Sequence, residues 1–220
     1  MKVSSNDVAL AHAMAKHEVM KASDRLNSGL GHKILSSSNV KAFAKAVDAL
    51  FRGRVIDASV GRVIGSRAAA GVVVCDGDGE GNMTLVQLVF NAKRPFPYRV
   101  SAHTAPVVIQ HHALARLMQR ITGESSLPKV ISTIQPHLHA ALLWAVKNHP
   151  LDPNVEVSVT GLGLELSGSV DDHGVLRLKT TIDAPNMQSS TRKAWAMSDK
   201  VEVRIIWSPP LTRPAKGDTI

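Results

Sequence analysis

The sequence predicts an α+β fold, with an N-terminal helical pair followed by antiparallel β-sheet and helices packed on one face of that sheet. Apolar residues recur at three- and four-residue steps before Gly53, which is typical of helices. From Val55 the pattern changes to β-branched and apolar runs bounded by glycine, and a second set of such runs begins near residue 155. We therefore expect a helical region over 1–53 and an α+β domain over 54–220.

Two helices are predicted in the N-terminal region. Asn6 or Asp7 can cap the first, and Asn27–Gly29 ends it. Ser36–Asn39 opens the second, which ends at Gly53. Its apolar positions at helical spacing are Val40, Phe43, Val47, Leu50 and Phe51. We interpret the pair as packing or oligomerisation structure, with its Lys and Arg side chains in solvent.

Four runs predict the strands that follow, and they cover 55–64, 68–75, 83–90 and 98–109, the last interrupted near Pro106. The segment Asp76–Asn82 joins two of them. Its alternating acids resemble the start of a calcium loop, but Gln87 occupies the position of the bidentate glutamate in such loops. Because glycine, aspartate and asparagine favour tight turns, we expect a hairpin turn there.

The second half predicts a kinked helix, or two short ones, over about 126–148, because the apolar stripe continues across Pro136. Four alternating runs then predict an antiparallel meander, over 155–160, 164–170, 175–182 and 201–207. Asp171–Gly174 is a hairpin turn, and a short helix fits around 191–197. The pattern leaves open whether the strands form one sheet or two.

The composition indicates a globular protein with an acidic partner. The chain has 220 residues, 44% of them hydrophobic, which is enough for a sizeable core. Its formal net charge of +8 favours nucleic acid as partner, RNA before DNA, and an acidic protein such as a cognate inhibitor next. Oligomeric state is not readable from this pattern. Aromatic residues make up only 4% of the chain, so few stacking platforms for bases are expected.

The single cysteine, Cys75, lies in an apolar run, which indicates a buried core residue and a reducing compartment. We find neither a signal-peptide pattern nor an apolar run long enough to span a membrane. We therefore expect the protein to be cytoplasmic where it is made and to have no membrane partner. Delivery into another cell by a signal-independent route would leave no trace in the sequence.

The stretch from Pro106 to Thr122 is the one in which we expect chemistry. A strand-like run turns there directly into a helix whose apolar face is marked by Leu114, Leu117, Met118 and Ile121. His112, Arg116 and Arg120 follow at four-residue steps, which places an imidazole and two guanidiniums on one stripe of that helix. Like charges at this spacing repel, and a polyanion would relieve the repulsion.

The run His112-Ala-x-x-Arg116-x-x-x-Arg120-Ile-Thr122, entered from a short strand, resembles the first helix of small toxin-type ribonucleases of the barnase/EndoU/colicin/RelE-like fold group. The resemblance covers about sixteen residues. It implies that His112 is the catalytic histidine and Arg116 a phosphate contact. It also implies that Thr180 and Thr181 lie on a late strand facing them, with Thr181 in the site.

Further cations surround this stretch and are expected to bind nucleic acid. They are Lys93, Arg94, Arg99, Arg120 and Lys129, against the single acid Glu124 between residues 93 and 129. The pairs His111-His112 and His137-x-His139 invite a metal interpretation. However, adjacent residues on a helix point about 100° apart and residues two positions apart about 200°, so neither pair converges on one ion. We expect no metal site and no cofactor.

Metal-free cleavage of RNA requires a base for the ribose 2′-OH, an acid for the leaving 5′-oxygen and cations for the phosphorane charge. His112 and Arg116 fit the base and the cation, while His103 or His173 could be the acid. The sequence thus predicts a basic, nucleic-acid-directed protein and most specifically a metal-independent, toxin-type endoribonuclease acting by 2′-OH attack. The alternatives are a non-catalytic protein that binds nucleic acid or an acidic protein, and a purely structural assembly subunit.

Overall fold

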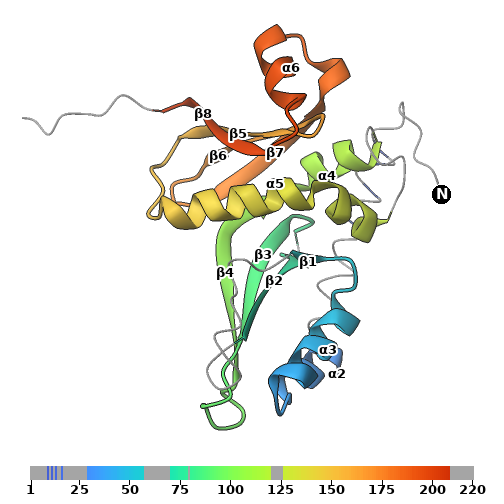
Figure 1. Ribbon diagram of the computed structural model, residues 1–220, viewed down its shortest axis with the longest axis vertical. Helices are drawn as coiled ribbons and strands as arrows, with labels where there is room; N and C mark the ends of the chain where they lie inside the picture. Colours follow the sequence, from blue (N-terminus) through green and yellow to red (C-terminus); the bar gives the residue numbers. More distant parts are fainter. Residues whose placement is uncertain are drawn as a thin grey trace, which may run out of the picture.

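The computed structural model describes residues 29–56, 70–78, 80–119 and 126–208, together with the isolated positions 9, 11, 13 and 16. Its strands form one eight-stranded sheet in the order β1-β2-β3-β4-β7-β6-β5-β8 (Figure 1). The strands are β1 Val55–Ile56, β2 Ala70–Gly77, β3 Met83–Phe90, β4 Val100–Ile109, β5 Glu156–Gly161, β6 Leu164–Val170, β7 Leu176–Asp183 and β8 Glu202–Trp207. The helices are α2 Gly29–Leu35, α3 Val40–Leu50, α4 His111–Leu117, α5 Leu127–Lys147, the 3-10 turn η2 Ala184–Asn186 and α6 Ser190–Ala196. The predicted α+β class is confirmed.

Two antiparallel halves make up the sheet. β1 to β4 pair in sequence order, and β5, β6 and β7 form a meander as predicted. The predicted place of the last strand was wrong, because β8 pairs with β5 at the edge of the sheet instead of following β7. The halves meet where β4 runs parallel to β7 over three residue pairs, Val107 with Leu176, Val108 with Arg177 and Ile109 with Leu178. This parallel pair was not predicted. Between the two strands the chain passes through α4, α5, β5 and β6. The helical crossover returns the chain as β5 in the direction of β4, and the two antiparallel pairings through β6 give β7 the direction of β5.

α4 and α5 cover one face of the sheet, as predicted. The buried residues of both helices share one cluster with β4, β5 and β7, including Leu114, Leu138, Ile109, Val157 and Leu178. α5 is a single helix of 21 residues despite Pro136, rather than two short ones. It runs across the front of the sheet in Figure 1 and contacts β4, β5 and β8. Both halves of the sheet are thereby held by one helix.

α2 and α3 pack on the opposite face of the β1–β4 half. Val74, Leu88 and Phe90 alternate with the residues that face α5, and they form a separate cluster with Phe43 and Val47 of α3. The rings of Phe43 and Phe90 stack with their centroids 5.6 Å apart. α3 agrees with the second predicted helix, and Asn39 caps it by accepting from the N–H of Ala42. Most of the first predicted helix lies outside the described residues, whereas α2 was not expected.

β4 leads directly into α4, as the pattern from Pro106 to Thr122 predicts. The pairing with β3 is irregular between Thr84 and Val86, and the extra residues of β4 there include Pro106, which has no N–H to give to a ladder. Residues 120–125 lie outside the described ranges. Within those ranges, no helix combines the length and apolar character needed to cross a membrane.

Candidate functional site

α4 is fixed over the junction of the two sheet halves. The N–H of Gln110, just before the helix, donates to the carbonyl of Leu178 at 2.9 Å, which extends the β4–β7 pairing by one bond. The hydroxyl of Thr181 then donates to the carbonyl of Ala113 at 3.3 Å. Leu114 and Leu117 are fully buried in the cluster with α5. The helix backbone is thus held by β7, and its polar side chains lie on the other side.

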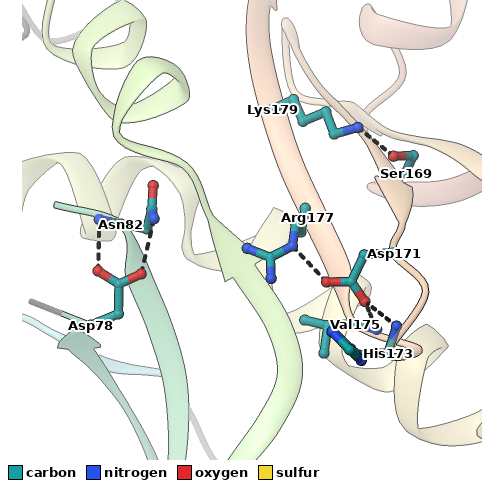
Figure 2. A network of polar contacts seen from close by, with 8 residues as sticks. All are labelled: Asp78, Asn82, Ser169, Asp171, His173, Val175, Arg177 and Lys179. Carbon is teal, nitrogen blue, oxygen red and sulfur yellow. Dashed lines mark hydrogen bonds and ion pairs between the residues drawn. The ribbon is translucent and has the colours of Figure 1, made fainter. Parts of the chain in front are cut away.

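The β2–β3 hairpin turn holds the first residue of α4. The side-chain carbonyl of Asn82 accepts from the N–H of His111 at 3.2 Å. Asn82 is itself oriented by Asp78, whose carboxylate accepts from the Asn82 backbone at 3.1 Å and from its side-chain amide at 2.9 Å (Figure 2). The predicted hairpin turn is therefore present, and its acid serves to brace the histidine-bearing helix.

His112 and Arg116 are both half-buried and lie one turn apart on α4. Burial lowers the pKa of His112 below its usual value, and the positive charges of Arg116 and His111 lower it further. His112 is therefore a neutral imidazole at neutral pH, in the form that can accept a proton. His111 is exposed and stands next to it. The structure thus brings His111, His112 and Arg116 together at one site.

The other predicted catalytic residues are not brought to this site. His103 is exposed on β4, where its ring nitrogen contacts the Ser101 hydroxyl at 3.1 Å. Six residues of extended strand separate His103 from Ile109, which corresponds to about 20 Å. Thr181 does face α4, but it is only 2% exposed and its hydroxyl is engaged by Ala113. His173 is exposed in the β6–β7 turn, on the far side of Leu176 from α4.

The predicted nucleic-acid contacts fall into two groups. Lys93, Arg94 and Arg99 lie in the β3–β4 loop, at the end of β4 opposite to α4. Ten residues of strand separate that loop from α4, which is about 30 Å. Lys129 is exposed in the first turn of α5, and Arg120 lies outside the described residues. The fold therefore does not make one continuous surface of the segment from 93 to 129.

A polar network on the face of the β5–β8 half opposite to α5 was missed by the sequence reasoning. Lys179 donates to the hydroxyl of Ser169 at 2.6 Å, and Arg177 pairs with Asp171 at 2.6 Å (Figure 2). Burial would raise the pKa of Asp171, but hydrogen bonds from Val175, Arg177 and His173 lower it overall. Ser169 pairs with Arg177, and Lys179 lies two residues further along β7, so alternation places Lys179 on the same face as Ser169. The signal was therefore present in the alternating pattern of the two strands joined by the predicted hairpin turn.

Thr180 belongs to this face opposite to α5 rather than to the α4 side. It pairs with Ser167 and lines a depression of about 230 Å³ with Lys179 and Arg192. Glu165, which is fully buried, accepts from Arg192 of α6 and from the Ser167 hydroxyl. The adjacent residues Thr180 and Thr181 thus serve different faces of the sheet.

Among the residues that the structure describes, no three His, Cys, Asp or Glu side chains are placed to hold one metal ion. Cys75 is buried, and burial raises the pKa of its thiol well above its usual range. No protein-family model, curated protein or solved structure matches this chain.

Proposed function

We propose that this chain is a basic, nucleic-acid-directed protein and, most specifically, a metal-independent endoribonuclease of toxin type whose reaction takes place at α4. The observation that carries the proposal is the pairing of a half-buried, neutral His112 with Arg116 one turn away. A neutral imidazole can act as general base, and a guanidinium can hold a phosphate through two hydrogen bonds.

In this reaction His112 accepts the proton of the ribose 2′-OH while the 2′-oxygen attacks phosphorus. The bond from phosphorus to the 5′-oxygen breaks, and an acid protonates that oxygen. The products are a 2′,3′-cyclic phosphate and a 5′-hydroxyl. We assign the acid to His111, rather than to His103 or His173, because His111 directly precedes His112 in α4 and its charge is one of the causes that lower the pKa of His112. Arg116 stabilises the phosphorane charge.

A labelled RNA incubated with the purified protein in EDTA tests this proposal. We expect cleavage to persist without divalent metal and to leave 2′,3′-cyclic phosphate ends. His112→Ala should slow cleavage about a hundredfold or more, because a general base contributes on that order. His103→Ala is the matched control, since His103 is exposed and about 20 Å from the helix. Intact RNA in the metal-free assay, or equal losses in the two variants, would contradict the proposal.

Non-catalytic binding of nucleic acid is the second candidate, and the position of Thr181 favours it. The resemblance to toxin-type ribonucleases placed that threonine in the site, yet its hydroxyl is buried against Ala113. Binding without cleavage, weakened steeply by salt because counterions are released, would support this candidate. Cytoplasmic synthesis and a cognate acidic inhibitor remain parts of the main proposal.

A further inference from the structure

The β3–β4 loop presents two aromatic rings to solvent. It runs Asn91-Ala-Lys-Arg-Pro-Phe-Pro-Tyr-Arg99, so its rings alternate with prolines between basic residues. Phe96 is 59% exposed and Tyr98 is 68% exposed. The chain has only four phenylalanines and a single tyrosine. Exposing these two rings to water forgoes the stabilisation that their burial in the core would give, which favours a role in binding.

Hydrogen bonds hold the loop in one shape. The N–H of Asn91 donates to the carbonyl of Arg99 at 2.7 Å, and the Asn91 side chain accepts from the N–H of Lys93 at 3.0 Å. The N–H of Tyr98 donates to the carbonyl of Pro95 at 2.9 Å. The Arg99 guanidinium donates to the carbonyl of Arg94 at 3.0 Å. A ligand would therefore meet rings and cations that are already ordered, which lowers the entropic cost of binding.

The fold adds cations from a distant part of the sequence. Arg99 also donates to the carbonyl of Ser38, which joins the loop to the turn between α2 and α3. Exposed lysines surround that turn, namely Lys33, Lys41 and Lys45. A depression of about 410 Å³ there is lined by Lys33, Lys45 and three serines. In Figure 1 the loop and this helical pair occupy the same end of the molecule.

Acidic residues are nearly absent from the segments that build this end. The sequence has no Asp or Glu from Gly81 to Gly123, and Asp48 is the one acid between residues 29 and 56. This excess of cations gives that end a positive potential, which favours binding of a negatively charged partner. We call the surface made by residues 91–99 and the exposed lysines of α2 and α3 the loop surface.

We propose that the loop surface binds single-stranded nucleic acid, with bases stacked on Phe96 and Tyr98 and phosphates contacted by Lys93, Arg94 and Arg99. Stacking requires unpaired bases, so a duplex, whose bases are already stacked, cannot use the two rings. An acidic protein would use the cations but has no planar bases for the rings. A membrane-binding loop would normally add aliphatic side chains, whereas Ala92 is the only aliphatic residue of this tip besides the prolines.

This inference rests on the proposed function for its ligand class and adds a binding site separate from the reaction site. The loop surface and α4 lie at opposite ends of β4, about 30 Å apart. A strand of RNA bound at both places would be held at two points. The loop surface accordingly selects unpaired RNA, while α4 acts on the phosphodiester bond.

Fluorescence anisotropy with a labelled single-stranded 2′-deoxy oligonucleotide tests the inference, because this probe lacks the 2′-OH and cannot be cleaved. Phe96→Ala and Tyr98→Ala should each weaken binding by about tenfold or more. Tyr98→Phe should retain affinity and Tyr98→Leu should not, which separates stacking from apolar burial. Trp207→Ala is the aromatic control, since Trp207 is 48% exposed on β8, at the far edge of the sheet. Affinity for the matching duplex should change little in all four loop variants.

Unchanged single-strand affinity in Phe96→Ala and Tyr98→Ala would overturn the inference. The inference would also be overturned if these two variants lost binding to phosphatidylserine vesicles but kept their affinity for the oligonucleotide. The two proposals fail separately. If the loop variants lose binding but the wild type cleaves no RNA, the loop surface stands and the ribonuclease fails. If His112→Ala abolishes cleavage while the loop variants bind and cleave as the wild type does, the ribonuclease proposal stands and the loop-surface proposal fails.

Discussion

The side-chain carbonyl of Asn82 accepts the backbone N–H of His111 at 3.2 Å, so a hairpin turn of the sheet holds the first residue of the candidate catalytic helix. That N–H belongs to the first turn of α4, where it has no partner within the helix. Gln110, at the capping position, makes no side-chain hydrogen bond to the helix. Asn82, which directly precedes β3, therefore provides the side-chain acceptor for the helix N-terminus that a capping residue normally provides.

We expect Asn82→Ala to reduce the free energy of unfolding by about 2 kcal/mol, because the side chain loses its hydrogen bonds to His111 and to Asp78, each contributing about 1 kcal/mol. It should also speed amide hydrogen exchange at the start of α4. Asn148→Ala is the control, since it also removes an asparagine side-chain hydrogen bond, the one that Asn148 donates to the carbonyl of Trp144 at the far end of α5. Equal exchange at α4 in both variants would show that Asn82 does not hold the helix.

The pKa of His112 should rise when Arg116 is replaced by Met. Burial is the larger cause of the lowered pKa and remains in the variant, so we expect only partial return to the usual value. Titration of the His112 ring resonances by NMR measures the change. In the wild type, the base-catalysed limb of the cleavage profile should follow the same lowered pKa. An unchanged pKa in Arg116→Met would remove the electrostatic link between the two side chains.

Buried His137 should make stability fall in mild acid. Its Nε2 contacts the carbonyl of Gly161 at 3.0 Å, and its Nδ1 has no hydrogen-bond partner among the described residues. Burial lowers its pKa despite the backbone hydrogen bonds. Because the folded pKa lies below the unfolded value of about 6.5, the unfolded chain takes up a proton first, and stability is lost as pH falls through that range.

Urea unfolding between pH 7.5 and 5 measures this effect. His137→Gln should reduce the pH dependence, since glutamine can still donate to Gly161 but does not titrate. His112 contributes in the same direction, so the comparison is best made with His112→Gln in both proteins. A pH dependence that is identical with and without His137 would contradict the prediction.

The ion pair between Glu165 and Arg192 should stabilise the docking of α6 on the sheet. Glu165 is fully buried, while the Arg192 side chain is 36% exposed. Arg192→Met would leave a buried carboxylate without its cation. We expect the free energy of unfolding to fall by up to about 3 kcal/mol, which is less than for a fully buried pair because water screens the partly exposed Arg192. The double variant Glu165→Met with Arg192→Met should recover much of this loss. Thermal unfolding of the two variants decides between these outcomes.

The sequence predicts the strands well because apolar and polar residues alternate along most of them. The bounds of β5, β6, β7 and β8 lie within one residue of the expected ones, and the strand that contains Pro106 leads directly into a helix as expected. Periodicity does not encode which strands become neighbours, so the parallel pair of β4 and β7 could not be predicted. Residues 57–69, where a predicted strand continues, lie outside the described ranges.

The candidate site was predictable only in part, for a geometric reason. His112 and Arg116 were found because helical spacing keeps them together. Arg99 and His112 are close in sequence, yet ten extended residues carry the chain about 30 Å between them. Conversely, Arg99 contacts Ser38, which is far away in sequence, through a fold that local patterns do not reveal. Separation in sequence therefore predicts separation in space poorly when a long strand lies between two residues.

The short parallel contact between β4 and β7 sets an order for folding. The other strand pairings join neighbours in sequence, except that β5 pairs with β8 about 42–51 positions later. Val107 and Leu176 lie further apart still, by nearly seventy positions. Closing so long a loop costs chain entropy that only three residue pairs and the α4 and α5 contacts offset. We therefore expect the backbone amides of the two sheet halves to become protected from hydrogen exchange separately during refolding. The helix that bears His112 should become ordered last.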